Sequence, residues 1–162
     1  MLQEYIAFNT WANEKICQQI NLLSDEQLSI EIVSSFKSIR ETLLHIWFAQ
    51  DIWLERLHGN SPVKWPSRAF EGTKEELIAG LITSSRKLEE KAFTYSKQKL
   101  KQQVSYKTLK GLEGQSSVYQ VLMHVANHGT YHRGQLVTML RQAGSTSIPA
   151  TDLIAFYREA GK

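Results

Sequence analysis

The chain has 162 residues, of which 42% are hydrophobic and 22% are charged, and its formal net charge is +3. This length and composition predict one folded domain over residues 1–162 and exclude a disordered chain. The single cysteine, Cys17, excludes an intrachain disulfide and CxxC redox or zinc chemistry. Charged residues interrupt the N-terminal segment, so we expect neither a signal peptide nor a membrane span, and a cytoplasmic location.

Apolar residues spaced three and four positions apart predict helices along most of the chain. The expected helices are residues 2–23, 39–57, 73–92 and 117–142, with one short terminal helix over 148–159. Ser34 or Ser35 is expected to cap the second helix, and Thr73 the third. Helices of this length predict an all-α fold in which four of them form a bundle.

Two connections interrupt this helical pattern. Residues 59–72 contain Pro62 and Pro66 and have a glycine at each end, which favours a long crossover over a tight turn. Residues 97–114 lose the helical pattern and include two glycines, Gly111 and Gly114, so we expect an irregular or briefly extended connection there.

Three histidines, His124, His128 and His132, recur at every fourth position of the last long helix. This spacing places neighbouring imidazoles on one helix face, about one turn apart. A buried imidazole without a partner costs about 1–3 kcal/mol, so a metal ion or a set of hydrogen bonds is expected. The spacing is compatible with a metal-chelating pair and also with ordinary core or surface histidines. It also leaves open whether His124 or His128 is the first member of the pair.

A third ligand has to come from another helix. His45 is the natural candidate, because it lies in the middle of the most apolar helical segment. His58 lies next to Gly59 at the end of that segment, where a histidine commonly interacts with free helix carbonyls.

Three segments of the chain carry a family resemblance: WANEK at 11–15, SIRETLLHIWFAQDIWLERL at 38–57, and HVANHGTYHRGQLVTMLRQAG at 124–144. In their order and spacing, the chain resembles the DinB/YfiT-like family of metal-binding proteins over nearly its whole length. The resemblance implies an up-down-down-up four-helix bundle. It also implies a divalent metal ion held by His45, His128 and His132, with His124 usually not a ligand.

Three neutral protein ligands leave a coordination position open, which is typical of a catalytic site. Zinc or nickel is the first expectation for the ion, with iron, copper or manganese as alternatives. The site predicts an enzyme that transfers a low-molecular-weight thiol to an electrophile or hydrolyses a small substrate, with a slight preference for thiol transfer. Glu41 and Asp51 are candidate acid–base or surface groups, and His124 and Gln135 are candidate pocket residues near the ligands.

Other hypotheses stay open beside this one. The bundle could bind metal without catalysis, and a homodimer is a further possible assembly. Basic residues between 86 and 110 suggest DNA binding, but no recognition-helix pattern accompanies them, so we expect a small-molecule substrate and no nucleic-acid partner. Trp47 and Trp53 occur among apolar residues at helical spacing and are expected to be core or pocket wall.

Overall fold

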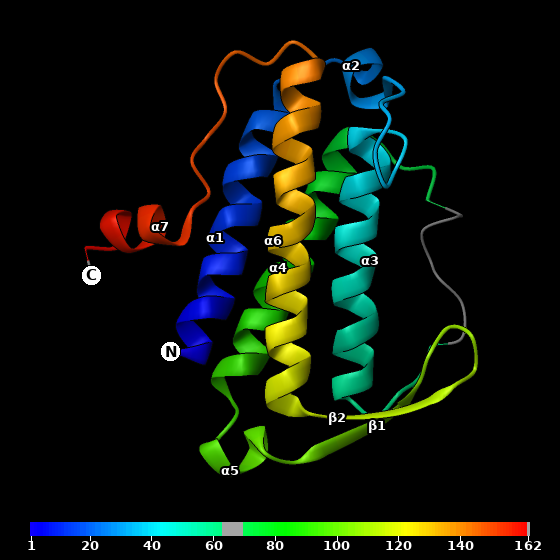
Figure 1. The fold of residues 1–162 in the computed structure, drawn as a ribbon, viewed down its shortest axis with the longest axis vertical. Coiled ribbons are helices and arrows are strands. Elements are labelled where there is room, and N and C mark those ends of the chain that lie inside the picture. Colours follow the sequence, from blue (N-terminus) through cyan, green and yellow to red (C-terminus); the bar gives the residue numbers. More distant parts are fainter. Residues whose placement is uncertain (63–69, 162) are drawn as a thin grey trace.

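The structure of the protein is a computed structural model that describes residues 1–62 and 70–161 and is mostly helical (Figure 1). The elements in chain order are α1 (Leu2–Asn21), α2 (Asp25–Ser29), α3 (Ile39–Leu57), α4 (Lys74–Phe93), α5 (Lys97–Leu100), β1 (Gln103–Lys107), β2 (Glu113–Ser117), α6 (Val118–Gln142) and α7 (Leu153–Glu159). Within these ranges, no helix combines the length and the apolar character that crossing a bilayer requires.

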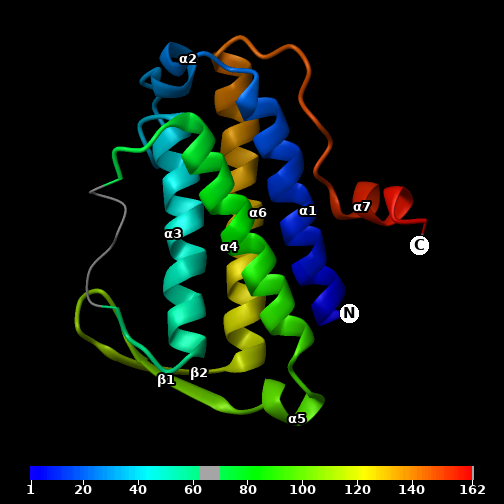
Figure 2. The ribbon, with the colours of Figure 1, turned by 180° about the vertical axis from the view of Figure 1, so that it is seen from behind.

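Four long helices, α1, α3, α4 and α6, lie side by side. α1 and α6 run in one direction and α3 and α4 run in the opposite direction (Figures 1 and 2). Both α1 and α3 pack against α4 and against α6. The four predicted long helices are therefore confirmed, whereas the terminal helix is shorter than predicted and begins at Leu153. Pro149 disfavours helical geometry at Ile148, and Asp152, at the N-cap position, has an extended backbone.

Hydroxyl side chains cap the N-termini of α2, α3, α4, α5 and α6. Thr73 caps α4 as predicted, and Ser117 caps α6, each in a reciprocal capping box. The predicted cap of α3 at Ser34 or Ser35 is wrong, because Ser38 Oγ accepts the backbone N–H of Glu41 at 3.2 Å. Residues 30–37 instead form an irregular segment before the helix.

The connection before α6 contains a small antiparallel hairpin that the expected all-α class does not include. β1 pairs with β2 in a register that sets Tyr106 opposite Gly114. A Cβ on Gly114 would lie only 2.7 Å from the Tyr106 ring, so the glycine leaves room for that ring. Gly111, with a φ of +79°, allows the turn between the strands. The fold is therefore mostly helical with one two-stranded sheet, and an all-α class is not confirmed.

The crossover connection between α3 and α4 is described only at its ends. Gly59 ends α3 with a φ of +89°, as a glycine just past a helix commonly does. Residues 63–69, which include Pro66, lie outside the described residues.

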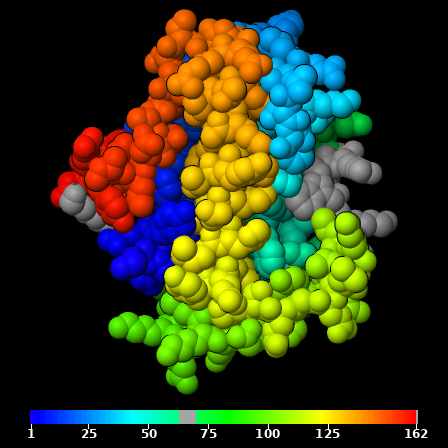
Figure 3. All heavy atoms as spheres, in the orientation of Figure 1, coloured from blue at the N-terminus to red at the C-terminus, as the bar shows by residue number. Residues whose placement is uncertain are grey.

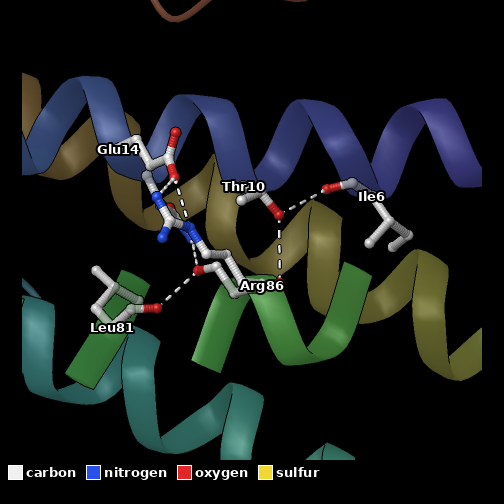
Figure 4. Close-up of polar contacts among 7 residues, drawn as sticks. Ile6, Thr10, Glu14, Leu81 and Arg86 are labelled. Carbon is white, nitrogen blue, oxygen red and sulfur yellow. Dashed lines mark hydrogen bonds and ion pairs between the residues drawn. The ribbon is translucent and has the colours of Figure 1, made fainter. Parts of the chain in front are cut away.

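Polar contacts join α1 to α4 along their shared interface (Figure 4). Thr10 Oγ1 donates to the carbonyl of Ile6 in its own helix, at 3.4 Å, and to that of Ser85 in α4, at 3.3 Å. Arg86 donates from two nitrogens to Glu14 Oε1, at 2.8 and 3.1 Å. The Arg86 side chain is 64% exposed, so this ion pair contributes little to stability.

A buried polar network crosses the centre of the four helices. Arg133 of α6 is 2% exposed, and its Nη1 donates to Asn9 Oδ1 and to Asn13 Oδ1, both at 2.8 Å. The two asparagines continue the network, with bonds of 3.0 Å to Gln50 Oε1 of α3 and 2.9 Å to Ser85 Oγ of α4. One buried guanidinium is thereby connected to all four long helices.

Candidate metal centre

Three histidines from two helices converge between α3 and α6. His45 Nε2 lies 2.9 Å from His128 Nε2, and His132 Nε2 lies 3.1 Å from the same atom. One ligand nitrogen from each of the three rings lies within 4.8 Å of the others. The i, i+4 spacing of His128 and His132 on α6 creates half of this cluster, and the packing of α3 against α6 brings in His45.

Gln135 and Ser35 fix the orientation of the His132 ring. The Gln135 side chain donates from Nε2 to Ser35 Oγ at 2.8 Å, and its Oε1 lies 2.7 Å from His132 Nδ1. In this arrangement the N–H of His132 Nδ1 donates a hydrogen bond to Oε1, so His132 Nε2 carries the lone pair, which points into the cluster. A hydrogen bond of this kind on the far nitrogen is typical of metal-binding histidines.

Burial keeps the three imidazoles neutral. Burial, together with a smaller effect of the neighbouring histidines, lowers the pKa of His45 to about 4 and that of His128 to about 3. Burial also lowers the pKa of His132, although the hydrogen bond to Gln135 opposes this shift. Neutral imidazoles with free lone pairs are the form in which histidine binds metal, so no proton has to leave at neutral pH.

Two of the three nitrogen–nitrogen spacings are close to what a metal ion requires, and all three nitrogens lie within 4.8 Å of one another. Two nitrogens bound at 2.0–2.1 Å in tetrahedral geometry lie about 3.3 Å apart. The observed distances of 2.9 and 3.1 Å are within a few tenths of an ångström of that value. The residues present therefore fit a divalent ion with three nitrogen ligands.

Aromatic side chains enclose this cluster. Phe36 stacks on His45 with 4.3 Å between the ring centroids and lies 5.6 Å from the His132 ring. Tyr131 packs edge-on against His132 at 5.0 Å. Sequence reasoning missed Phe36 and Ser35, because both belong to the irregular segment before α3, where no periodic pattern indicates which side chains point inward.

The other candidate residues lie at different places. His124 is exposed, its ring centroid is 5.7 Å from that of His128, and it is not part of the cluster of converging nitrogens. Glu41 Oε2 accepts the backbone N–H of Lys37, and Asp51 Oδ1 accepts the hydroxyl of Ser84 on α4 at 2.6 Å. Of the four predicted pocket residues, only Gln135 is hydrogen-bonded to one of the three clustered histidines in the described part of the chain.

His58 is exposed at the C-terminus of α3, where its backbone N–H donates to the carbonyls of Leu54 and Glu55. This is the helix-end position expected from the sequence.

A second group of side chains continues from His124 toward the hairpin. His124 packs edge-on against Trp53 at 5.1 Å, and Trp53 packs in the same way against Tyr106 at 5.0 Å. The Arg56 guanidinium carbon lies 4.3 Å from the Trp53 ring and 4.9 Å from the Tyr106 ring. Burial lowers the pKa of His124, and the charge of Arg56 lowers it further. Trp53 also packs against the hydrophobic core, which is one of the two positions expected for it.

Comparison with known proteins agrees with this geometry. The family model for the DinB family matches residues 1–160. The chain belongs to the DinB family. It is 31% identical to Protein DinB of Bacillus subtilis (strain 168) over 147 residues, which cover 88% of this chain and 86% of that protein. The resemblance inferred from the three sequence segments is confirmed.

Solved structures of DinB-like proteins share the fold. A DinB-like protein from Bacillus cereus ATCC 10987 superimposes with a TM-score of 0.69 at 20% identity, covering 90% of this chain and 94% of that one. A DinB-like protein from Bacillus subtilis gives a TM-score of 0.67 at 16% identity, with 93% and 97% of the two chains covered.

Proposed function

We propose that this DinB-family chain binds one divalent metal ion through His45, His128 and His132 and acts on a small molecule at that ion. The observation that supports this most is the convergence of the three imidazole nitrogens, with His132 held by Gln135 in the orientation that directs a lone pair inward. Zinc or nickel is our first proposal for the ion, and iron, copper or manganese are alternatives.

We also propose that the chain forms a single domain in the cytoplasm, with its four long helices arranged as the up-down-down-up bundle, and that a homodimer is its assembly. None of these points is needed for the metal-site proposal.

Catalysis is proposed because three protein ligands leave room for a fourth, exchangeable one. A divalent ion in such a site lowers the pKa of a bound water and ionises a bound thiol. The reactions we propose are the transfer of a low-molecular-weight thiol to an electrophile, first, and hydrolysis of a small substrate, second.

The chain's own residues would contribute positioning, shielding and proton transfer. Gln135 holds the His132 ring, and Phe36 shields His45 on one side. His124 lies beside His128, and partial desolvation of its exposed ring, together with the charge of Arg56, lowers its pKa, which favours the neutral form. A ring nitrogen of His124 could therefore accept the proton that the thiol or water releases.

Elemental analysis of protein purified without a polyhistidine tag tests the metal site. Wild-type protein is expected to carry one ion per chain, and His45→Ala, His128→Ala and His132→Ala are each expected to lose it. His58→Ala is the matched control that keeps the ion. Loss of metal in His58→Ala together with retention in His128→Ala would overturn the ligand assignment.

Cobalt substitution tests whether the site is open. The visible spectrum of the cobalt protein should change on addition of azide or a small thiol, and His124→Ala should keep both metal and response. A spectrum that does not respond would favour a metal-binding protein without catalysis. Rates with a small thiol plus 1-chloro-2,4-dinitrobenzene, and with 4-nitrophenyl acetate, then separate thiol transfer from hydrolysis.

A further inference from the structure

Arg56, in the last turn of α3, is a buried cation with few partners. Its side chain is 6% exposed, and the guanidinium packs against the rings of Trp53 and Tyr106. Within residues 1–62 and 70–161, the guanidinium makes one hydrogen bond, from Nη2 to the carbonyl of Lys107 at 3.1 Å. Its Nε is buried and has no acceptor in this part of the chain.

No carboxylate balances this charge. The ion pairs found among the described residues do not include Arg56. The seven residues at 63–69 contain no aspartate or glutamate in their sequence, so they could not supply a carboxylate side chain. Arg133 is also buried without a carboxylate, but it makes three hydrogen bonds to neutral oxygens. Arg56 differs, because among the described residues it makes a single hydrogen bond and its buried Nε has no acceptor.

A buried charge without a counter-ion is costly, and proteins rarely keep one unless a partner group neutralises it. A guanidinium presents donors in a flat fork that matches a carboxylate, which can accept two parallel N–H bonds. The two aromatic rings cover part of the Arg56 guanidinium, which favours a small planar anion over a bulky one.

Arg56 is connected to the three-histidine cluster by a continuous row of side chains. The contacts run from Arg56 to Trp53 at 4.3 Å, from Trp53 to His124 at 5.1 Å, and from His124 to His128 at 5.7 Å. In Figure 3 a stretch of α3, in teal, is visible between the yellow atoms of α6 and the yellow-green atoms of the hairpin. The Arg56 guanidinium and the histidine cluster therefore lie at the two ends of one short row of side chains.

We propose that Arg56 binds a carboxylate of the substrate, so that the thiol or other small molecule acted on at the three histidines is an acid. This proposal rests on the proposed function and adds the chemical class of the substrate. In this arrangement the reacting group lies at the histidine cluster, and the carboxylate lies at the hairpin end of the α3–α6 face. Arg56 is then a specificity-determining residue and takes no part in the reaction itself.

Binding of ω-mercaptocarboxylates to the cobalt-loaded protein tests the proposal. Acids with three, six and eight carbons are each compared with the corresponding primary amide, which keeps the thiol and the shape but removes the charge. The dissociation constant is measured from the change in the cobalt spectrum. At the best-matched length, the acid should bind the wild-type protein about ten-fold or more tightly than its amide, as a charge-assisted hydrogen bond implies.

Substitutions then assign the preference to one residue. Arg56→Gln should reduce the acid-to-amide ratio to about two-fold or less, while the affinity for the amide and the metal content stay unchanged. Arg56→Lys keeps the charge and should keep part of the ratio. Arg40→Gln is the matched control, because Arg40 is on the same helix and also packs against an aromatic ring, Phe70, at 5.7 Å.

The outcomes separate the two proposals. If neither acids nor amides change the cobalt spectrum, the open metal site of the proposed function fails. If both bind with equal affinity at every length, the metal site stands and the role of Arg56 is refuted. A preference for acids that survives in Arg56→Gln would also refute it. If Arg56→Gln does not fold, the ratio in Arg56→Lys decides, because an unchanged ratio there contradicts a role for the guanidinium fork.

Discussion

Gly129→Ala should destabilise the protein, although alanine is usually better than glycine inside a helix by about 1 kcal/mol. A Cβ at position 129 would lie 2.4 Å from Asn9 Oδ1 and 2.8 Å from Arg133 Nη1. Moving Asn9 away breaks its bond to the buried guanidinium, which is worth about 1.5–3 kcal/mol, and overpacking adds about 1–3 kcal/mol. After subtraction of the helix gain, we expect a loss of about 1.5–5 kcal/mol in the free energy of unfolding.

Gly134→Ala in the same helix is the matched control. No atom lies within 4 Å of a Cβ placed there, so this substitution should stabilise the protein by about 0.5–1 kcal/mol. Urea denaturation followed by circular dichroism, with EDTA present so that metal affinity does not contribute, measures both changes. If Gly129→Ala proves as stabilising as Gly134→Ala, a Cβ at position 129 does not disturb the hydrogen bond between Asn9 and Arg133, and the prediction is wrong.

Three further predictions concern the histidines and the cysteine. Gln135→Leu should weaken metal binding about 10–100-fold, measured by chelator competition, because His132 loses the group that orients it; unchanged affinity would contradict this. Without metal, stability should be highest above pH 6.5 and fall from there toward pH 4. The pKa values of His45 and His128 are lowered to about 4 and about 3, so the unfolded chain binds more protons in that range. The free energy of unfolding should change by at most about 1.4 kcal/mol per pH unit per histidine, and by less because the rings are partly exposed. Equal unfolding midpoints at pH 7 and 5.5 would contradict this pH dependence. Cys17, whose pKa burial raises to about 12, should resist iodoacetamide in the native protein and react in urea; native labelling at pH 8 would argue against its burial.

Much of the metal centre could be predicted from the sequence. The i, i+4 spacing of His128 and His132 is a local property of one helix, and it places two nitrogens together in any fold that keeps the helix. His45 is on a different helix, so spacing alone only suggested it. The family resemblance identified His45 as the third ligand. The resemblance also favoured His128 over His124 as the first member of the helical pair.

The features that could not be predicted from the sequence depend on contacts between segments that are far apart in the chain. The hairpin strands are five residues each, and only Val104 and Tyr106 of β1 are partly buried, so their alternating pattern is weak. Arginine is usually exposed, and nothing near Arg56 in the sequence indicates that a hairpin about fifty residues later covers it. Phe36 and Ser35 reach the histidines from a segment without regular structure, for which no periodicity exists.

The position of the histidines in the chain has a consequence for folding. His45 and His128 are 83 residues apart in the sequence, yet their Nε2 atoms lie only 2.9 Å from each other. An ion bound to both would act as a reversible cross-link that closes a loop of that size, comparable to a disulfide, for which chain-entropy arguments give about 4.5 kcal/mol. The HxxxH pair on α6 could still hold the ion in the unfolded chain, which would reduce this gain. A chelator would therefore remove the stabilisation that the ion gives to the folded chain, as well as empty the site.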